Sequence, residues 1–234
     1  RRGAKAVYCA PTIQNPTATL MPQSRRAEIA TIARRHGLLI IEDDVHALLP
    51  ETLTPPIASF APEASLFIVS TSKVLAPGLR IAFIRSPLPH AGRLAAGIRT
   101  TTWGTPPLMA EIVSRWIRSG EAESILASRR REAHARQALA ASVLGGAKLT
   151  AHPSGYHLWL HLGEPWHSET FATEARSRGV LVTPASVFAV GGGPVHNGVR
   201  LCLGAARSRD ELERGLVRVH EALSAVPEAE GAVV

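Results

Sequence analysis

The sequence is poor in lysine, cysteine and aromatic residues, and these shortages exclude several classes of protein. Its 26 basic residues are 23 arginines and only three lysines, Lys5, Lys73 and Lys148. The two cysteines lie far apart in apolar segments, which excludes a disulfide framework and a cysteine-based metal cluster. No apolar run approaches the roughly 20 residues of a membrane-spanning helix. We therefore expect a globular protein of the reducing cytoplasm.

The composition is that of an ordinary globular protein with an excess of positive charge. Of 234 residues, 45% are hydrophobic and 19% are charged, and the formal net charge is +7. This balance excludes a disordered chain. The arginine excess suits phosphate or carboxylate partners, although a solvated arginine-rich surface explains it equally well. Residues 114–136 are rich in arginine but carry no helix-turn-helix pattern, so we favour solvent exposure over contact with nucleic acid there.

The first half of the sequence alternates short apolar runs with helical patterns. Strands are predicted at residues 6–10, 38–41, 66–69 and 81–84. A helix is predicted over residues 22–36, where apolar residues recur at helical spacing and Gly37 gives a stop signal. Continuous apolar strands that alternate with helices are typical of a parallel sheet that is covered on both faces. The first half is therefore predicted to be α/β.

The rest of the sequence changes character. Helices are predicted over residues 88–100, 106–118, 121–144, 168–178 and 208–223, and strands over 148–152, 156–162, 180–183 and 199–203. Ser208, with Glu211 three residues later, has the pattern of a helix-capping box. We predict a partial large domain over residues 1–125, a smaller α+β domain over 126–226, and a loose tail over 227–234.

Polar residues follow three of the predicted strands. Gln14-Asn15-Pro16-Thr17 follows the first, Glu42-Asp43-Asp44-Val45-His46 ends the second, and Ser70-Thr71-Ser72-Lys73 ends the third, with Arg80 shortly after. Ligands of open α/β sheets bind at the carboxyl ends of the strands. Each motif is weak alone, but their order together predicts a binding site.

In that order the motifs resemble those of the class I/II aminotransferases, which are fold type I pyridoxal-phosphate enzymes. The resemblance covers nearly the whole chain and is closest to the aminotransferase-like domain of MocR-type regulators of the GntR superfamily. It implies the later part of a mostly parallel-sheet large domain, a smaller α+β domain and a homodimer. The family's glycine-rich phosphate loop and ring-stacking aromatic would precede Arg1, so we expect an N-terminally truncated chain.

The resemblance assigns the two catalytic residues. Lys73 would form the Schiff base with the aldehyde of pyridoxal 5'-phosphate and then, once displaced, carry protons as general acid and base. Burial beside the cationic Arg80 would favour its neutral amine. Asp43 would face the pyridine nitrogen and keep it protonated, so that the ring withdraws electrons. The competing interpretations are a surface lysine and a helix-capping carboxylate. Asp44 is the weaker candidate and has the pattern of a cap.

The same resemblance assigns the remaining cofactor contacts. Arg80, Ser70 and Ser72 would hold the phosphate, since a guanidinium fork and hydroxyls suit a dianion. Asn15 would donate a hydrogen bond to the ring hydroxyl oxygen. The alternatives are that the serine hydroxyls only satisfy local backbone groups and that Asn15 is a turn residue.

Two further positions bear on the substrate and on departures from the family. Arg200 lies in an apolar strand and would bind the substrate carboxylate, although an ion pair at a strand edge is the alternative. His46 stands where the family has a tyrosine beside the ring, and its imidazole could replace that hydrogen bond or belong to an ordinary loop. Ala18 replaces the usual glycine after Asn-Pro-Thr, which concerns loop shape only.

Three other patterns in the sequence suggest functional sites, but each lacks a feature that such a site requires. Ser70 to Lys73 also matches the S-x-x-K motif of acylating serines, but Pro77 and Gly78 interrupt the helix that this motif opens and no Lys-Thr-Gly follows. His157 and His161 share one face of a strand, but no carboxylate completes a metal site. Residues 191–193 are three glycines with no following helix, which indicates a loop rather than a phosphate cradle.

The sequence thus predicts a pyridoxal-phosphate-binding, aminotransferase-like domain that binds an amino acid. Whether it catalyses transamination stays open. One interpretation is the effector-sensing part of a transcription regulator, with DNA contacted only through a domain outside this chain; the other is a fragment of a metabolic aminotransferase. A third is an inert fragment. A winged helix-turn-helix encoded upstream would indicate the regulator.

Overall fold

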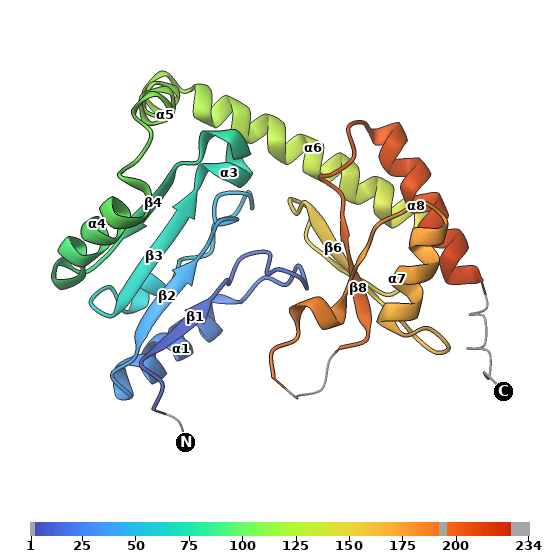
Figure 1. Ribbon diagram of the computed structural model, residues 1–234, viewed down its shortest axis with the longest axis horizontal. Coiled ribbons are helices and arrows are strands. Elements are labelled where there is room, and N and C mark those ends of the chain that lie inside the picture. Colours follow the sequence, from blue (N-terminus) through green and yellow to red (C-terminus); the bar gives the residue numbers. More distant parts are fainter. Residues whose placement is uncertain (1–2, 192–195, 226–234) are drawn as a thin grey trace. The chain divides into compact units, whose positions relative to one another are not determined.

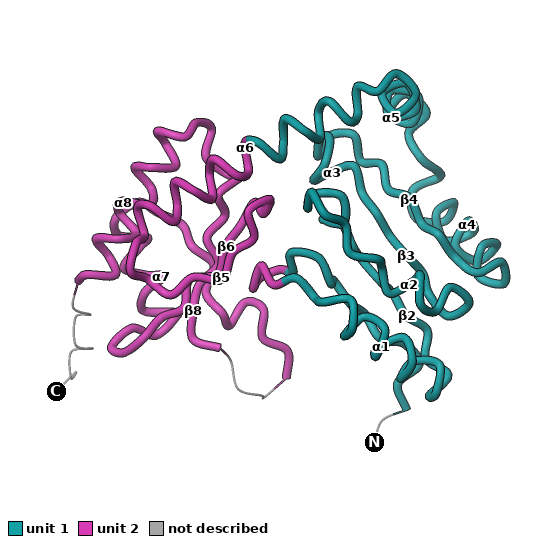
Figure 2. Tube along the Cα trace, turned by 180° about the vertical axis from the view of Figure 1, so that it is seen from behind, with its two compact units in different colours: residues 1–14, 20–131 teal, residues 15–19, 132–234 magenta. Residues whose placement is uncertain are grey.

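The computed structural model describes residues 3–191 and 196–225, which form two compact units (Figure 2). Unit 1 comprises Arg1–Gln14 and Leu20–Arg131, and unit 2 comprises Asn15–Thr19 and Glu132–Val234. The units divide within α6 (Glu121–Val143), six residues after the predicted boundary at 125. Across the described residues, every helix is too short or too polar to span a bilayer. The predicted tail and most of the glycine loop lie outside the described residues.

Unit 1 is built on a four-stranded sheet in the order β1-β2-β3-β4 (Figure 1). The strands β1 (Ala6–Cys9), β2 (Leu39–Asp43) and β3 (Ser65–Ser70) are parallel, as predicted. The fourth, β4 (Ala82–Arg85), is antiparallel to β3. Only α3 (Thr71–Val74) and the 3₁₀ turn η1 (Pro77–Leu79) separate β3 from β4, which is too short for the crossover that a parallel neighbour needs.

The two faces of this sheet differ. Helices α1 (Gln23–Arg35) and α2 (Ile57–Phe60) pack on one face, where Ile40 is fully buried against Ala30 and Ala33. The opposite face carries mostly half-buried and exposed side chains, although Leu66 there is buried. The remaining helices of unit 1 are α4 (Leu88–Thr102), α5 (Pro107–Ser119) and the first part of α6. The sheet therefore presents one covered face and one open face.

Unit 2 contains an antiparallel sheet in the order β5-β6-β8-β7. Its strands are β5 (Leu149–Ala151), β6 (His157–His161), β7 (Thr183–Pro184) and β8 (Gly198–Cys202). Helices α7 (Ser168–Ser177) and α8 (Arg209–Ser224), the turn η2 (Ala185–Phe188) and the end of α6 complete the unit. The predicted capping residue is confirmed, since the Ser208 hydroxyl accepts a hydrogen bond from the Glu211 amide at 3.1 Å.

The strand predicted over residues 180–183 is wrong in all but its last residue. The Val180 amide donates to the Ala175 carbonyl and thereby closes the end of α7. Val180 and Val182 pack as partly buried side chains against the core, and only Thr183 and Pro184 pair with β8. Apolar residues at this helix end produced the pattern of a strand.

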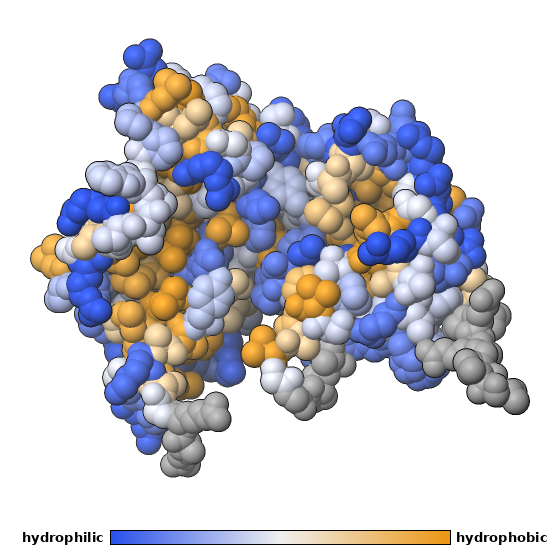
Figure 3. Space-filling view, in the orientation of Figure 1, coloured by the Kyte–Doolittle hydropathy of each residue, from blue (hydrophilic) through white to orange (hydrophobic). Residues whose placement is uncertain are grey.

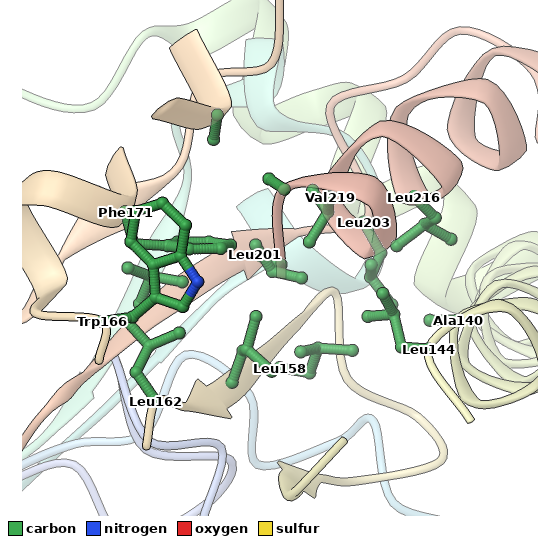
Figure 4. Close-up of a cluster of buried hydrophobic side chains, with 14 of the residues drawn as sticks. Ala140, Leu144, Leu158, Leu162, Trp166, Phe171, Leu201, Leu203, Leu216 and Val219 are labelled. Carbon is green, nitrogen blue, oxygen red and sulfur yellow. The ribbon is translucent and has the colours of Figure 1, made fainter. Parts of the chain in front are cut away.

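Unit 2 has a large apolar core cluster (Figure 4). Leu158 and Leu201 from the sheet meet Leu216 and Val219 of α8, and the rings of Trp166 and Phe171 pack edge to face with centroids 5.5 Å apart. Edge-to-face contact is a favourable geometry for aromatic pairs. This core gives unit 2 its own source of stability.

Candidate functional site

The predicted site residues of unit 1 gather at one edge of its sheet. Asp43 is the last residue of β2 and Ser70 the last of β3, and these parallel strands pair in register with Asp43 opposite Ile68. Lys73 follows in α3, and Arg80 ends η1 in the left-handed conformation, with φ of 53°. His46 lies buried in the turn after β2. The motifs thus come together at the carboxyl ends of the strands, where α/β sheets bind ligands.

The Asp43 carboxylate has a partner that the sequence did not indicate. Tyr8 Oη, on β1, donates a hydrogen bond of 2.6 Å to Asp43 Oδ2. The carboxylate raises the pKa of Tyr8 to about 12, because it accepts this hydrogen bond and its charge disfavours a tyrosinate. The phenol is therefore a hydrogen-bond donor at neutral pH.

The neighbouring carboxylates, Glu42 and Asp44, are held in a buried cluster around Arg26. Glu42 accepts hydrogen bonds of 2.8 Å from the Ile57 and Ala58 amides at the start of α2. Arg26, whose side chain is 0% exposed, lies 3.9 Å from Glu42 and 3.8 Å from Asp44. A buried arginine beside two carboxylates compensates part of the cost of removing them from water.

Arg26 and Asp44 also connect the two loops that follow β1 and β2. Thr12 Oγ1 donates to Asp44 Oδ2 at 2.8 Å and accepts from Arg26 Nη2 at 2.9 Å, and Arg26 Nε donates to the Met21 carbonyl. Burial raises the pKa of Asp44 to about 6 against the opposing effect of Thr12 and Arg26. Asp44 is thus a structural residue next to Asp43, and its role is larger than that of a helix cap.

The serine and lysine of the third motif have separate environments. Ser70 Oγ caps α3 by accepting from the Ser72 amide at 3.1 Å, so this hydroxyl does satisfy local backbone. A cap at this point also orders the first turn that carries Ser72 and Lys73. Lys73 itself is exposed, so the burial expected to favour its neutral amine is not present in this structure.

In unit 2 the structure brings Asn15 and Arg200 together. Arg200 Nη1 donates to Asn15 Oδ1 at 2.8 Å and Nη2 donates to Thr183 Oγ1 at 3.3 Å. The guanidinium carbon lies 5.1 Å from the ring centroid of Phe188. Among the described residues, Arg200 Nε is a buried donor without a hydrogen-bond partner. An unsatisfied charged donor of this kind favours an added acceptor such as a carboxylate.

The donor set fits a phosphorylated pyridine aldehyde. Lys73 supplies a primary amine, Asp43 a carboxylate with one oxygen bound by Tyr8, and Arg80 a cation, all at one sheet edge. These are the groups that an aldehyde, a protonated ring nitrogen and a phosphate require. The residues of unit 1 are therefore compatible with pyridoxal phosphate.

The other sites considered from the sequence find little support. Within residues 3–191 and 196–225, no group of three or more His, Cys, Asp and Glu residues could hold a metal ion. The prediction that the arginine-rich helix is exposed to solvent is wrong for Arg136. Its side chain is 11% exposed and donates to the Leu203 and Ala206 carbonyls. Arg130 likewise donates to the carbonyls of Leu48, Leu49 and Pro50. These two arginines bind backbone carbonyls of loops.

Sequence reasoning missed Tyr8, Thr12 and Arg26. Arg26 could have been found, because it lies one helical turn before the buried Ala30 and so belongs to the apolar stripe of α1. Tyr8 required the register of β1 and β2, which places it opposite Ile41 and on the same face as Asp43. That register is set by contacts distant in sequence.

Comparison with known proteins identifies the family of the chain. Residues 3–219 match the family described as Aminotransferase class I and II. The chain is 32% identical to the uncharacterized HTH-type transcriptional regulator YdeF of Bacillus subtilis, over 91% of this chain and 46% of the relative. It is 28% identical to the 2-aminoadipate transaminase of Thermus thermophilus, over 95% of this chain and 58% of the relative.

A solved structure extends the similarity to the fold. The chain superposes with a TM-score of 0.80 and 26% identity on LysN, an alpha-aminoadipate aminotransferase of Thermus thermophilus in complex with N-(5'-phosphopyridoxyl)-L-leucine. The match covers 94% of this chain and 58% of that one. The chain thus spans about half the length of these relatives. It contains the later part of a mostly parallel large domain and a smaller α+β domain, as in that structure. The chain belongs to the class I and II aminotransferases.

Proposed function

We propose that this chain is the pyridoxal-phosphate-binding, aminotransferase-like domain of a MocR-type transcription regulator, in which it senses an amino-acid effector. The observation that carries the proposal is the gathering of Asp43, Lys73 and Arg80 at one edge of the unit 1 sheet. Lys73 follows β3, the neighbour of the strand that ends in Asp43, and Arg80 follows the turn after it, so a primary amine, a carboxylate and a cation belong to one end of the sheet.

In this proposal the residues of unit 1 divide the cofactor among them. When bound, pyridoxal phosphate supplies an aldehyde and an electron-withdrawing ring. Lys73 Nζ would hold the aldehyde through an imine bond, with loss of water, and its free amine would serve as general acid and base. Asp43 accepts the hydrogen bond of the ring nitrogen and keeps it protonated. Arg80, with Ser72 and the α3 cap Ser70, holds the phosphate.

His46 has a place in the same proposal. It occupies the position of the tyrosine found in the family, in the turn that follows Asp43, and its side chain is buried. An imidazole there donates a hydrogen bond toward the ring oxygen when it is protonated or in the suitable tautomer. The replacement keeps a hydrogen-bond donor at this position.

Unit 2 contributes the amino-acid contacts. Arg200 binds the carboxylate of the amino acid through two parallel hydrogen bonds, as its buried, unpartnered Nε supports. Asn15, which now accepts from Arg200, donates its amide to the ring hydroxyl oxygen. A cation on an otherwise apolar strand is thereby matched with an anion.

The regulator is favoured over the metabolic enzyme by the relatives. Three of the relatives with 30% or greater identity are described as HTH-type transcriptional regulators of Bacillus subtilis. The 2-aminoadipate transaminase, at 28% identity, supports the alternative, a fragment of a metabolic aminotransferase. In the proposal the protein is a homodimer, and DNA is bound by a domain outside these 234 residues.

Trapping the covalent bond tests the cofactor assignment. Pyridoxal phosphate is added to the purified chain, the bond is reduced with borohydride, and the modified peptide is identified by mass spectrometry. With only three lysines, the expected adduct is on Lys73, is absent in Lys73→Ala and is unchanged in the control Lys5→Ala. An adduct on Lys5 or Lys148, or none, contradicts the assignment.

A second experiment separates sensor from enzyme. The loaded chain is mixed with single amino acids, and both the spectral change and the released oxo acid are followed. Exchange of Lys73 for the amino acid without stoichiometric oxo acid supports the sensor. Repeated turnover with an oxo-acid acceptor would establish the transaminase instead. Arg200→Leu is expected to abolish the response to amino acids but not to amines that lack a carboxylate.

A further inference from the structure

We propose that Tyr8 is the positioning residue of Asp43: its phenol holds Oδ2 so that the other carboxylate oxygen is presented to a protonated ring nitrogen. The inference rests on the proposed function, because it assigns Asp43 to that nitrogen. It adds a residue that lies on a different strand and outside all the motifs named above.

The strand register brings the two side chains together. Tyr8 pairs with Ile41 across the parallel strands, and Asp43 follows Ile41 by two residues. Alternate residues of a strand point to one face, so Tyr8, Ile41 and Asp43 share a face. The phenol reaches along that face to Asp43 Oδ2 at 2.6 Å. This is a short distance, typical of a hydroxyl bound to a charged acceptor.

This face of unit 1 is the open one. Helices α1 and α2 cover the other face, where Ile40 and Glu42 are fully buried. Tyr8 is 63% exposed, and Ile84 of β4, which shares this face through its pairing with Ile68, is 43% exposed. Figure 3 shows apolar side chains on the surface of unit 1. Tyr8 and Asp43 thus lie on the face of β1 and β2 that α1 and α2 do not cover.

The three consecutive acidic residues differ in what holds them. Glu42 is bound by backbone amides, Asp44 by Thr12 with Arg26 nearby, and Asp43 by a phenol. A cation beside Asp43 would neutralise the charge that a protonated ring nitrogen needs. A neutral donor orients the carboxylate and leaves its charge available. The hydroxyl of Tyr8 is thus suited to positioning, where lysine or arginine would compete with the ligand.

The protonation of the phenol is consistent with this role. The hydrogen bond to Asp43 is the largest cause of its raised pKa of about 12. Tyr8 therefore stays a donor throughout the physiological range, and the orientation of Asp43 does not vary with pH through this contact.

The first arm of the test needs no cofactor. The Tyr156→Phe background leaves Tyr8 as the one tyrosine. Tyrosinate absorbance is recorded after a stopped-flow jump to alkaline pH, before the chain unfolds. Tyr8 is expected to ionise near its raised pKa of about 12, and Asp43→Asn is expected to return it toward the ordinary 10. If Tyr8 ionises with a pKa near 10 and Asp43→Asn leaves that pKa unchanged, the proposal is overturned.

The second arm asks what the contact does for a ligand. Binding of pyridoxal phosphate and of its analogue with C–H in place of the ring nitrogen is measured by fluorescence. Loss of one partly exposed, charge-assisted hydrogen bond is expected to raise Kd for pyridoxal phosphate about threefold in Tyr8→Phe. The Kd for the analogue should not change, because it presents no ring N–H to Asp43.

The outcomes separate the two proposals. An equal loss of affinity for both ligands in Tyr8→Phe indicates a merely structural tyrosine and overturns the positioning role. If neither ligand binds the unaltered chain, the proposed function fails, while the alkaline jump still decides whether Tyr8 holds Asp43. If Tyr8→Phe weakens the binding of pyridoxal phosphate but not of the analogue, and Asp43→Asn lowers the pKa of Tyr8, the proposed function and the positioning role are both supported.

Discussion

The two units of this chain bury different kinds of side chain. Unit 2 encloses leucines, valines and aromatic rings around an antiparallel sheet. Unit 1 has a smaller apolar cluster and buries Arg26, Glu42 and Asp44 under the ends of its parallel strands. Apolar burial is non-directional, whereas a buried ionic cluster requires defined partners and distances. Unit 1 thus uses polar burial at the place where its loops must be held in register for chemistry.

The largest loss of stability is expected for a substitution in the apolar core of unit 2. Phe171→Ala is expected to destabilise unit 2 by about 4 kcal/mol, because a fully buried ring is lost and a cavity remains. Hydrogen exchange measured by mass spectrometry should show the loss of protection in α7, β6 and β8. Phe83→Ala in unit 1 is the control, since that ring is 50% exposed. Equal losses in both variants would contradict the difference between the units.

The next effect concerns the ionic cluster. Arg26→Met is expected to destabilise unit 1 by about 3 to 4 kcal/mol, because two buried carboxylates lose their cation. Arg25→Met is a matched control, since the neighbouring Arg25 side chain is 62% exposed and pairs with Glu28 on the surface. Urea unfolding followed by exchange in β1 and β2 measures both. If Arg26→Met lowers the free energy of unfolding no more than Arg25→Met does, the ionic cluster does not stabilise unit 1.

The cluster also predicts a pH dependence confined to unit 1. Because the pKa of Asp44 is raised to about 6 in the folded chain, its contribution to the free energy of unfolding is complete at low pH. That contribution is lost as pH rises through the folded pKa. The loss is expected to be about 2 to 3 kcal/mol between about pH 4 and pH 7. The difference between the unaltered chain and Asp44→Asn isolates it from other titrations.

A flat difference over this range would show that Asp44 ionises in the folded chain as it does when unfolded. The opposite slope, with the unaltered chain gaining stability as pH rises, would mean that Arg26 lowers the pKa of Asp44 more than burial raises it. Only the opposite slope would make the cluster a net stabilising ion pair, and either result would contradict the raised pKa of Asp44.

The smallest predicted effect tests a feature that the units share. Ser208 caps α8 in unit 2 and Ser70 caps α3 in unit 1. Ser208→Ala is expected to cost about 1 kcal/mol in unfolding free energy, and Ser208→Asp should retain most of the stability. Ser70→Ala should have a smaller effect on stability, because α3 has only four residues. Its expected consequence is instead a slower reaction of Lys73 with aldehyde reagents, since the turn that carries Lys73 is less ordered.

Much of this architecture was predictable from local patterns. The parallel strands of unit 1 follow from continuous apolar runs, and α8 from its cap and apolar stripe. The gathering of Asp43, Ser70 and Lys73 follows from the rule that parallel strands end at one edge. By contrast, the direction of β4, the short β7 and the Tyr8–Asp43 contact depend on pairings between distant segments. Such pairings leave no periodic signal in a single sequence.

The brief segment Asn15–Thr19 belongs to unit 2, although both of its flanks belong to unit 1. The backbone therefore passes from one unit to the other at three points along the sequence, after residues 14, 19 and 131. A protease cut or gene truncation at the last of these would release residues 132–234 without Asn15, the residue that accepts from Arg200. Anyone who wishes to study unit 2 in isolation would need to rejoin this pentapeptide through a circular permutation or supply it as a complementing peptide.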